Sequence, residues 1–212
     1  MKIVVTGSGG RPGSLIARHL DKSHEVSCVD GASDLRDPEV LGPILDGTEV
    51  VVHAGAITDL HEDLVNDDAG ILDWSARGTY VLMDEACKQG VRRVVLVSSL
   101  DLLDGYPDSY VIDESWRPQP RPDAASLAPL MAERTCREFS RQRSIESICL
   151  RIGKIGAPEG TSEELLLKAV QRAVEMEIEP GVYRSWLFHV SDSERYPLRA
   201  AKGKPLSLGE TG

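Results

Sequence analysis

Three glycines near the start of the chain have the spacing of a phosphate-binding loop. Gly7, Gly10 and Gly13 each lie three residues apart, after a short apolar run. The first glycine permits a sharp turn, the second lets the backbone approach a diphosphate, and the third lets the next helix pack closely on the strand. The helix N-terminus then offers N–H groups and a positive dipole end to the anion. The other loop residues expected at the phosphate are Gly9, Arg11 and Pro12.

An acidic residue follows the next apolar run. Residues 25–29 predict a strand that ends at Asp30. A carboxylate at this position accepts hydrogen bonds from a ribose diol and repels a 2′-phosphate. The loop and Asp30 together predict a bound dinucleotide, with NAD favoured, while Arg11 and Arg36 keep NADP open as the alternative.

The elements that must position these residues alternate between strand and helix. Apolar runs at 2–6, 25–29, 50–53, 93–97 and 146–150 predict strands, and helical periodicity predicts helices at about 12–22, 69–89, 126–142 and 163–177. Such alternation indicates a parallel sheet covered on both faces. We therefore expect an α/β fold of the Rossmann type, doubly wound, over residues 1–180. Residues 181–212 are less periodic and predict a small, irregular C-terminal cap within the same domain.

Composition argues against several classes of partner. The net charge of −10 disfavours nucleic acid, and no apolar run approaches the ~20 residues that cross a bilayer, so no membrane partner is expected. The four cysteines lack metal-ligand spacing, and the acidic run 59–68 lacks the pattern of a hard-metal loop, so no metal is expected. The first residues enter a strand directly, which predicts a cytoplasmic protein without a signal peptide.

Several short segments, the glycine loop among them, follow one another in the order and spacing of a known family. Through these segments the first 158 residues or so resemble the extended short-chain dehydrogenase/reductase family, in its NAD-dependent epimerase/dehydratase group, and within that group the uronate dehydrogenases. The segments are Val4-Val5-Thr6-Gly7 to Gly13, Asp34-Leu35-Arg36-Asp37, Val51-Val52-His53-Ala54-Gly55-Ala56, Gly78-Thr79-Tyr80, Val95-Leu96-Val97-Ser98-Ser99 and Leu150-Arg151-Ile152-Gly153.

The resemblance implies further cofactor contacts at the carboxyl ends of the strands. Asp34 and Leu35 match an acid-aliphatic pair that meets the adenine, and Ser98 and Ser99 match a strand end near the nicotinamide. A structural alternative stays open at two places: a hydrogen-bonded histidine at a strand end for His53, and simple strand-end hydrogen bonding for Ser98 and Ser99. The segment that matches the family's stretch beneath the cofactor is His53, Ala54, Gly55 and Ala56.

The family's catalytic residues have no counterpart in this chain. The family uses a tyrosine, whose pKa of ~10 is lowered by a lysine four residues later, with a serine or threonine and an upstream asparagine. Alignment places Ser75 at the asparagine, Leu100 at the serine, Ala125 at the tyrosine and Pro129 at the lysine, and none of the five tyrosines is followed by lysine four residues on. Residues that could replace the missing catalytic groups are Tyr106, Tyr110, Lys154, Asp101 and Asp104, and Arg184 could bind a substrate anion.

Three functions remain as alternatives. The preferred one is an NAD-binding sensor, regulator or inactive homologue. The second is an active oxidoreductase or epimerase that acts on a nucleotide sugar or sugar acid through relocated groups, and the third is a scaffold with a vestigial nucleotide site. The resemblance also implies a homodimer, paired through helices near 69–89 and 126–142. The residues expected at that interface are Leu127, Leu130, Met131, Arg134 and Phe139.

Overall fold

A single parallel sheet forms the centre of the molecule. The computed structural model describes residues 1–31, 34–54, 67–142, 145–178 and 184–198. Within them the strands lie in the order β2-β1-β3-β4-β5-β6, and every pair is parallel. This order reverses beside β1, as in a doubly wound Rossmann-type fold, so the predicted fold class is confirmed. The strands are β1 Lys2–Thr6, β2 Glu25–Val29, β3 Val50–His53, β4 Arg93–Ser99, β5 Glu146–Ile152 and β6 Ser185–Val190.

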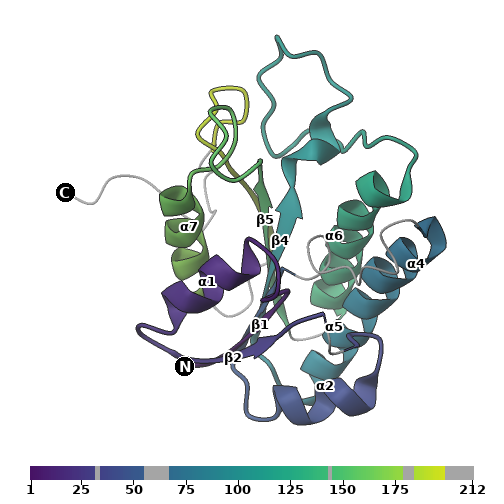
Figure 1. Cartoon of the computed structure of the whole chain (residues 1–212), viewed down its shortest axis with the longest axis vertical. Coiled ribbons are helices and arrows are strands. Elements are labelled where there is room, and N and C mark those ends of the chain that lie inside the picture. The colour runs from purple at the N-terminus through teal and green to yellow at the C-terminus, as the bar shows by residue number, and fades with distance from the viewer. Residues whose placement is uncertain (32–33, 55–66, 143–144, 179–183, 199–212) are drawn as a thin grey trace.

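Helices cover both faces of the sheet. Figure 1 shows α1 and α7 on one side and α2, α4, α5 and α6 on the other. The first layer consists of α1 Gly13–Leu20 and α7 Glu163–Glu175. The second consists of α2 Pro38–Leu45, α4 Asp68–Leu72, the π-helical turn η2 Asp73–Arg77, α5 Gly78–Lys88 and α6 Ala124–Gln142, while the short 3₁₀ helix η3 Leu100–Leu103 follows β4.

Alternation along the strands builds a separate apolar core under each layer. In β5, Ile148 and Leu150 belong to the core beneath α1 and α7, whereas Cys149 belongs to the core beneath α2, α5 and α6. All seven β5 residues are buried because β4 and β6 flank this strand and helices lie over it. A strand covered on both faces has no polar side, which is why the central strands read as nearly continuous apolar runs.

The sequence interpretation missed the strand β6. Residues 181–212 were expected to form an irregular cap, but Ser185–Val190 forms an edge strand paired with β5. Trp186, Phe188 and Val190 alternate toward the core beneath α7. This period of two is short and lies between weakly patterned flanks, so it gave little signal. The division of the chain at residue 180 stays a prediction.

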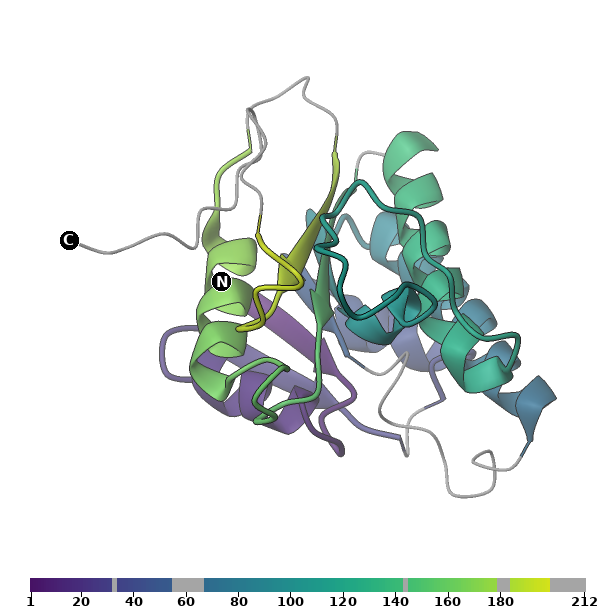
Figure 2. The same ribbon diagram turned by 90° about the horizontal axis from the view of Figure 1, so that it is seen from above.

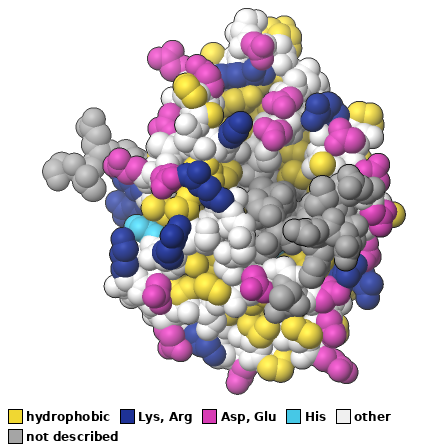
Figure 3. Space-filling view, in the orientation of Figure 1, with side chains coloured by type: hydrophobic (Ala, Val, Ile, Leu, Met, Phe, Trp, Pro, Cys, Tyr) yellow, Lys and Arg dark blue, Asp and Glu magenta, His cyan; other side chains and the backbone are white. Residues whose placement is uncertain are grey.

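Two further observations bear on the class of protein. None of the helices formed by the described residues combines the length and apolar character needed to cross a bilayer. On the face shown in Figure 3, acidic and basic side chains are interspersed, with scattered hydrophobic ones between them.

Candidate functional site

The turn between β1 and α1 depends on two of its glycines. Gly7 has a φ of 77°, in the left-handed region that favours glycine. Its N–H and that of Ser8 donate to Val29 O, at 2.9 and 3.3 Å, so the turn is tied to the end of β2. A Cβ on Gly13 would lie 2.1 Å from Gly7 O, so any larger residue would push the helix off the loop. The first and third glycines therefore bring the start of α1 against the strand end.

The rest of the loop is ordered by its own backbone. Gly10 N donates to Gly7 O at 3.3 Å, and Ser14 N donates to Gly10 O at 2.9 Å. Pro12 is buried at the start of α1, while Gly9 and Arg11 are exposed. Arg11 forms an ion pair with Glu163 in the first turn of α7. The loop is thus held between β2 and α7 and keeps an open outer side.

Asp30 lies at the same edge of the sheet. It directly follows β2 and is exposed to solvent. Because Val29 O receives the N–H groups of Gly7 and Ser8, the end of β2 and the glycine loop are direct neighbours. This places a carboxylate beside a turn built for close approach.

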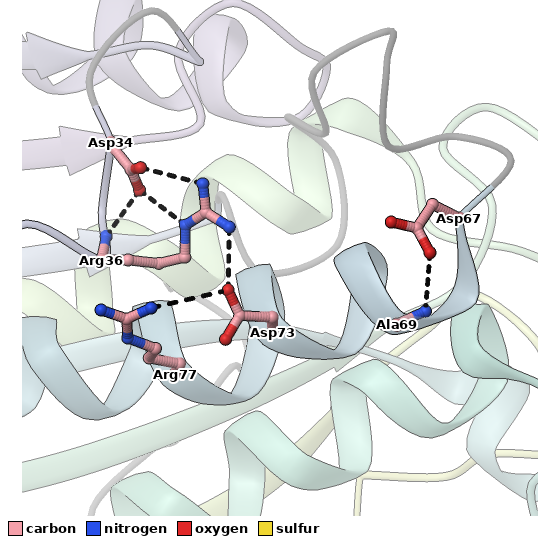
Figure 4. A network of polar contacts seen from close by, with 6 residues as sticks. All are labelled: Asp34, Arg36, Asp67, Ala69, Asp73 and Arg77. Atoms are coloured by element: carbon pink, nitrogen blue, oxygen red, sulfur yellow. Dashed lines mark hydrogen bonds and ion pairs between the residues drawn. The ribbon is translucent and has the colours of Figure 1, made fainter.

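Farther along this edge, an ion-pair network surrounds Arg36 (Figure 4). Its Nε and Nη2 donate to the two oxygens of Asp34, each at 2.9 Å, and its Nη1 donates to Asp73 Oδ2 at 2.8 Å. These hydrogen bonds raise the pKa of Arg36 and lower that of Asp34. The guanidinium also lies 5.6 Å from the centre of the Trp74 ring. Leu35, between the two charged residues, is buried.

His53 ends β3 inside the protein. Its Nδ1 lies 2.7 Å from Thr6 Oγ1 and its Nε2 lies 3.1 Å from Thr79 Oγ1. Burial lowers the pKa of His53 to about 4, so the ring is neutral at pH 7, with one nitrogen donating and the other accepting. The ring links β1, β3 and α5. Ala54 follows it, buried, and donates to Thr6 O at 3.2 Å. Gly55 and Ala56, expected beneath the cofactor, lie outside the described residues.

The two serines at the end of β4 point to different surroundings. Ser98 is buried, and its hydroxyl donates to Glu133 Oε1 of α6 at 2.7 Å. The same carboxylate accepts two hydrogen bonds from Arg151 of β5, at 2.8 and 2.7 Å. Ser98 is therefore bonded within the fold, whereas Ser99 lines a cavity at the carboxyl ends of β4 and β5.

Two cavities hollow the carboxyl edge of the sheet. The first, of about 450 Å³, lies between the glycine loop and the ends of β4 and β5; we call it the crevice. The second, of about 770 Å³, lies between η3 and the segments 153–160 and 192–196. Asp101 and Lys154 line both cavities. Asp104 lines the second, where burial and the charge of Asp101 raise its pKa. The crevice is lined by Arg11, Pro12, Ser99, Asp101, Ile152, Gly153, Lys154 and Ile155.

The positions aligned with catalytic groups have other surroundings here. Ser75 is buried in η2 and donates to Ala128 O at 2.9 Å, which fixes α6 against the π-helical turn. Leu100 is buried in an apolar cluster. Ala125 is exposed in the first turn of α6, and Pro129 is buried within the same helix.

The two tyrosines that could replace the catalytic tyrosine, Tyr106 and Tyr110, contact Trp116 in the segment that follows η3. Tyr106 donates its hydroxyl to Arg117 O at 2.9 Å, and its ring meets that of Trp116 edge-on at 4.8 Å. Tyr110 is exposed and lies 6.0 Å from the same ring. Neither lines the crevice. Arg184 directly precedes β6. It therefore lies at the N-terminal end of that strand, opposite the carboxyl edge of the sheet.

Sequence reasoning missed the buried pair between Glu133 and Arg151. Their side chains are 8% and 3% exposed and are bonded through both oxygens. The available signals were an arginine inside an apolar strand and an acid at a core position of the helix 126–142. A charge in such a position is almost always paired.

Comparisons with known proteins agree with this architecture. A model of the NAD dependent epimerase/dehydratase family matches residues 3–192. Sterol demethylase protein B of Methylococcus capsulatus is 29% identical over 137 residues, which are 57% of this chain and 40% of that protein, so the match spans less than half of the relative's length. Among solved structures, a mutated uronate dehydrogenase has a TM-score of 0.73 at 22% identity, covering 92% of this chain and 76% of its own. A short-chain dehydrogenase/reductase superfamily protein from Agrobacterium tumefaciens, with bound NAD, has a TM-score of 0.72 at 18% identity, covering 90% and 77%.

Proposed function

The chain belongs to the NAD dependent epimerase/dehydratase family, and from this premise we propose that it binds NAD(H) at the crevice and acts as a cofactor-binding sensor or regulator. The observation that carries the proposal is the approach of Gly13 to Gly7, where a Cβ would lie 2.1 Å from a backbone oxygen. A turn this tight is what a diphosphate site at a helix N-terminus requires. The NAD named in the Agrobacterium tumefaciens structure supports the choice of cofactor.

The proposed contacts assign one role to each part of the edge. Main-chain N–H groups of the loop 7–13 hold the diphosphate, other than those of Gly7, Ser8 and Gly10, which donate within the fold, and Arg11 lies on its exposed side. Asp30 accepts hydrogen bonds from the adenosine ribose, and Asp34 with Leu35 borders the adenine. The bound nicotinamide would supply hydride chemistry, and the crevice at Ser99 is where its ring would lie.

The same geometry favours NAD over NADP. A 2′-phosphate would meet Asp30, which carries the same sign of charge. Arg36, which follows β2 in the chain, could offset this charge, but Asp34 and Asp73 already engage both sides of its guanidinium. Moving Arg36 to a phosphate would leave these two carboxylates without their strongest partner.

We propose a sensor without turnover because of the residues that occupy the positions aligned with the family's catalytic groups. Leu100, Ala125 and Pro129 carry no titratable group, and Ser75 donates its hydroxyl to a backbone carbonyl. Proton transfer coupled to hydride transfer needs a donor with a pKa near the working pH. In this proposal the ligand therefore binds and shifts a conformation or an assembly, without being consumed.

The test is calorimetric titration of the full chain with NAD and NADH. We expect saturable binding, lost in Gly13→Ala because its Cβ meets backbone. Gly42→Ala is the matched control: Gly42 also lies in a helix, but its added Cβ would meet nothing nearer than 3.7 Å. No binding at millimolar ligand would overturn the proposal and leave the scaffold alternative. Equal losses in the two variants would show that the tight turn is not the binding site.

A second function, turnover by relocated groups, is favoured by one observation. Asp101 and Lys154 line both cavities at the carboxyl edge, so an acid and a cation border the place expected for the nicotinamide. NADH absorbance, followed over a panel of uronates and nucleotide sugars, tests this alternative. Turnover that falls at least about a hundredfold in Asp101→Asn but not in Asp108→Asn, a control that lines the second cavity but not the crevice, would replace the sensor with an enzyme.

A further inference from the structure

A third cavity lies on the face of the sheet that α6 covers, whereas the crevice lies at the carboxyl ends of the strands beside the glycine loop. It has a volume of about 610 Å³ and is enclosed by α6, the strands β5 and β6 and the loop 114–118; we call it the arginine cavity. It shares no lining residue with the two cavities at the carboxyl edge. Its size falls within the ~300–1,000 Å³ typical of small-molecule sites. Figure 2 shows the segment between η3 and α6 looping beside β5 and β6.

Positive charge gathers in this cavity although the protein as a whole is acidic. Arg134 and Arg137, three residues apart on α6, line it together with Arg117 of the loop. Across the described ranges, no carboxylate forms an ion pair with any of these three arginines. Arginines nearby on the same loop and helix do pair with carboxylates: Arg121 with Asp123 and Arg141 with Glu138.

A fourth arginine forms the inner wall. Arg151 is 2% exposed, and two of its nitrogens bond to Glu133. Its Nη1 is buried and has no hydrogen-bond partner among the described residues. Glu114 also lines the cavity and acts electrostatically on Arg151. Two carboxylates line the cavity: Glu133, whose charge Arg151 balances, and Glu114, beside three guanidinium groups that form no ion pair within the described ranges.

From these observations we propose that the arginine cavity binds a small organic anion that carries two or more carboxylate or phosphate groups. Guanidinium groups match both chemistries through paired hydrogen bonds. Trp116 and Leu187 line the same cavity and offer apolar surface to the carbon skeleton of such a ligand. The site is separate from the proposed dinucleotide crevice and does not depend on it.

The experiment titrates the full chain with citrate and with pyrophosphate at constant ionic strength, by calorimetry and by tryptophan fluorescence. Citrate probes carboxylate recognition and pyrophosphate probes phosphate recognition. The Gly13→Ala background separates the pyrophosphate signal of the arginine cavity from that of the crevice. We expect saturable binding of at least one probe with 1:1 stoichiometry, unchanged in Gly13→Ala.

Matched double variants identify the site. Arg117→Gln with Arg137→Gln removes two cavity charges and should weaken binding by at least about tenfold, because both guanidinium groups would donate charge-assisted hydrogen bonds to the anion. Arg121→Gln with Arg141→Gln removes two charges from the same loop region and helix, outside the cavity, and should change the affinity by less than about twofold. All four residues are exposed, so folding should persist, as circular dichroism will check. Absence of saturable binding of both probes, or equal weakening in both double variants, would overturn the proposal.

Discussion

At His53, two threonine hydroxyl groups engage both nitrogens of a ring that solvent does not reach. Charging the ring would remove the acceptor nitrogen that one hydroxyl needs and would place a cation in the core. Burial and these two hydrogen bonds therefore favour the neutral ring, so protonation of His53 should destabilise the folded protein. Because Thr6 ends β1 and precedes the glycine loop, the same ring also supports the proposed cofactor site.

The pH dependence of unfolding should reveal this histidine. The pKa falls from 6.5 in the unfolded chain to about 4 in the folded protein, so the unfolded state binds the proton first as pH decreases. Stability from this group is complete above pH 6.5 and is lost between about 6.5 and 4. We expect the free energy of unfolding to drop by about 2 kcal/mol between pH 7 and pH 5 through His53 alone.

Urea denaturation at pH 7 and pH 5 provides the measurement. The variant His53→Asn should be less stable at pH 7, yet lose less stability on acidification than the parent. His19→Asn, a partly exposed position on α1, is the control and should keep the parental pH dependence. A parental slope in His53→Asn would mean that another group causes the acid sensitivity.

At the scale of elements, one buried arginine connects β4, β5 and α7. Arg93 is fully buried and pairs with Glu146 through Nε at 2.8 Å. Its other nitrogens donate to the carbonyls of Ala173, Val174 and Met176 at 2.8 to 2.9 Å, at the C-terminal end of α7. Arg93 thus satisfies helix-end carbonyls that have no partner within the helix. It also fixes α7, whose first turn holds the glycine loop through Glu163 and Arg11.

Removal of this arginine should destabilise the fold strongly. Arg93→Met keeps much of the side-chain volume but takes the close partner from buried Glu146, which keeps its 3.7 Å contact with Arg92, and takes the donor from three carbonyls. We expect a loss of about 3 to 5 kcal/mol in the free energy of unfolding. Arg92→Met removes the longer and more exposed contact to the same carboxylate, at 3.7 Å, and should change it by less than about 1 kcal/mol. Chemical denaturation of both variants decides, and similar values for the two would contradict the role given to Arg93.

The elements also show what sequence alone could predict. The glycine loop was predictable because its geometry depends on residues close together in the chain, and the apolar strands because their pattern is local. The pairs Arg36–Asp73 and Arg151–Glu133 join residues far apart in sequence, and periodicity does not specify such partners. Edge strand β6 was missed because its alternation covers few residues. The proposed roles of Gly55 and Ala56 stay predictions.

At the scale of the whole molecule, the outer face of α5 and α6 leaves large apolar groups in solvent. Tyr80 is 55% exposed and Met131 is 38% exposed. The ring of Tyr80 meets that of Phe139 edge-on at 5.4 Å, across the two helices. A hollow of about 390 Å³ beside these rings is lined by Arg134, Glu138 and other residues of α6. We propose that a second copy of the chain covers this face, as the family resemblance implies for the homodimer.

Sedimentation velocity of charge variants tests the dimer. Tyr80→Glu places a carboxylate at the centre of the proposed interface, and its desolvation in the dimer should shift the protein to monomer at micromolar concentration. Tyr110→Glu makes the same chemical change at a tyrosine that is 48% exposed on the loop above β4, away from α5 and α6, and should leave the parental sedimentation coefficient. Repeating the runs with NADH asks whether the cofactor alters the assembly, as a sensor that acts through assembly requires. A parent that sediments as a monomer at every concentration would refute the interface, whereas a dimer that is indifferent to bound NADH would keep the interface and argue against a sensor that acts through assembly.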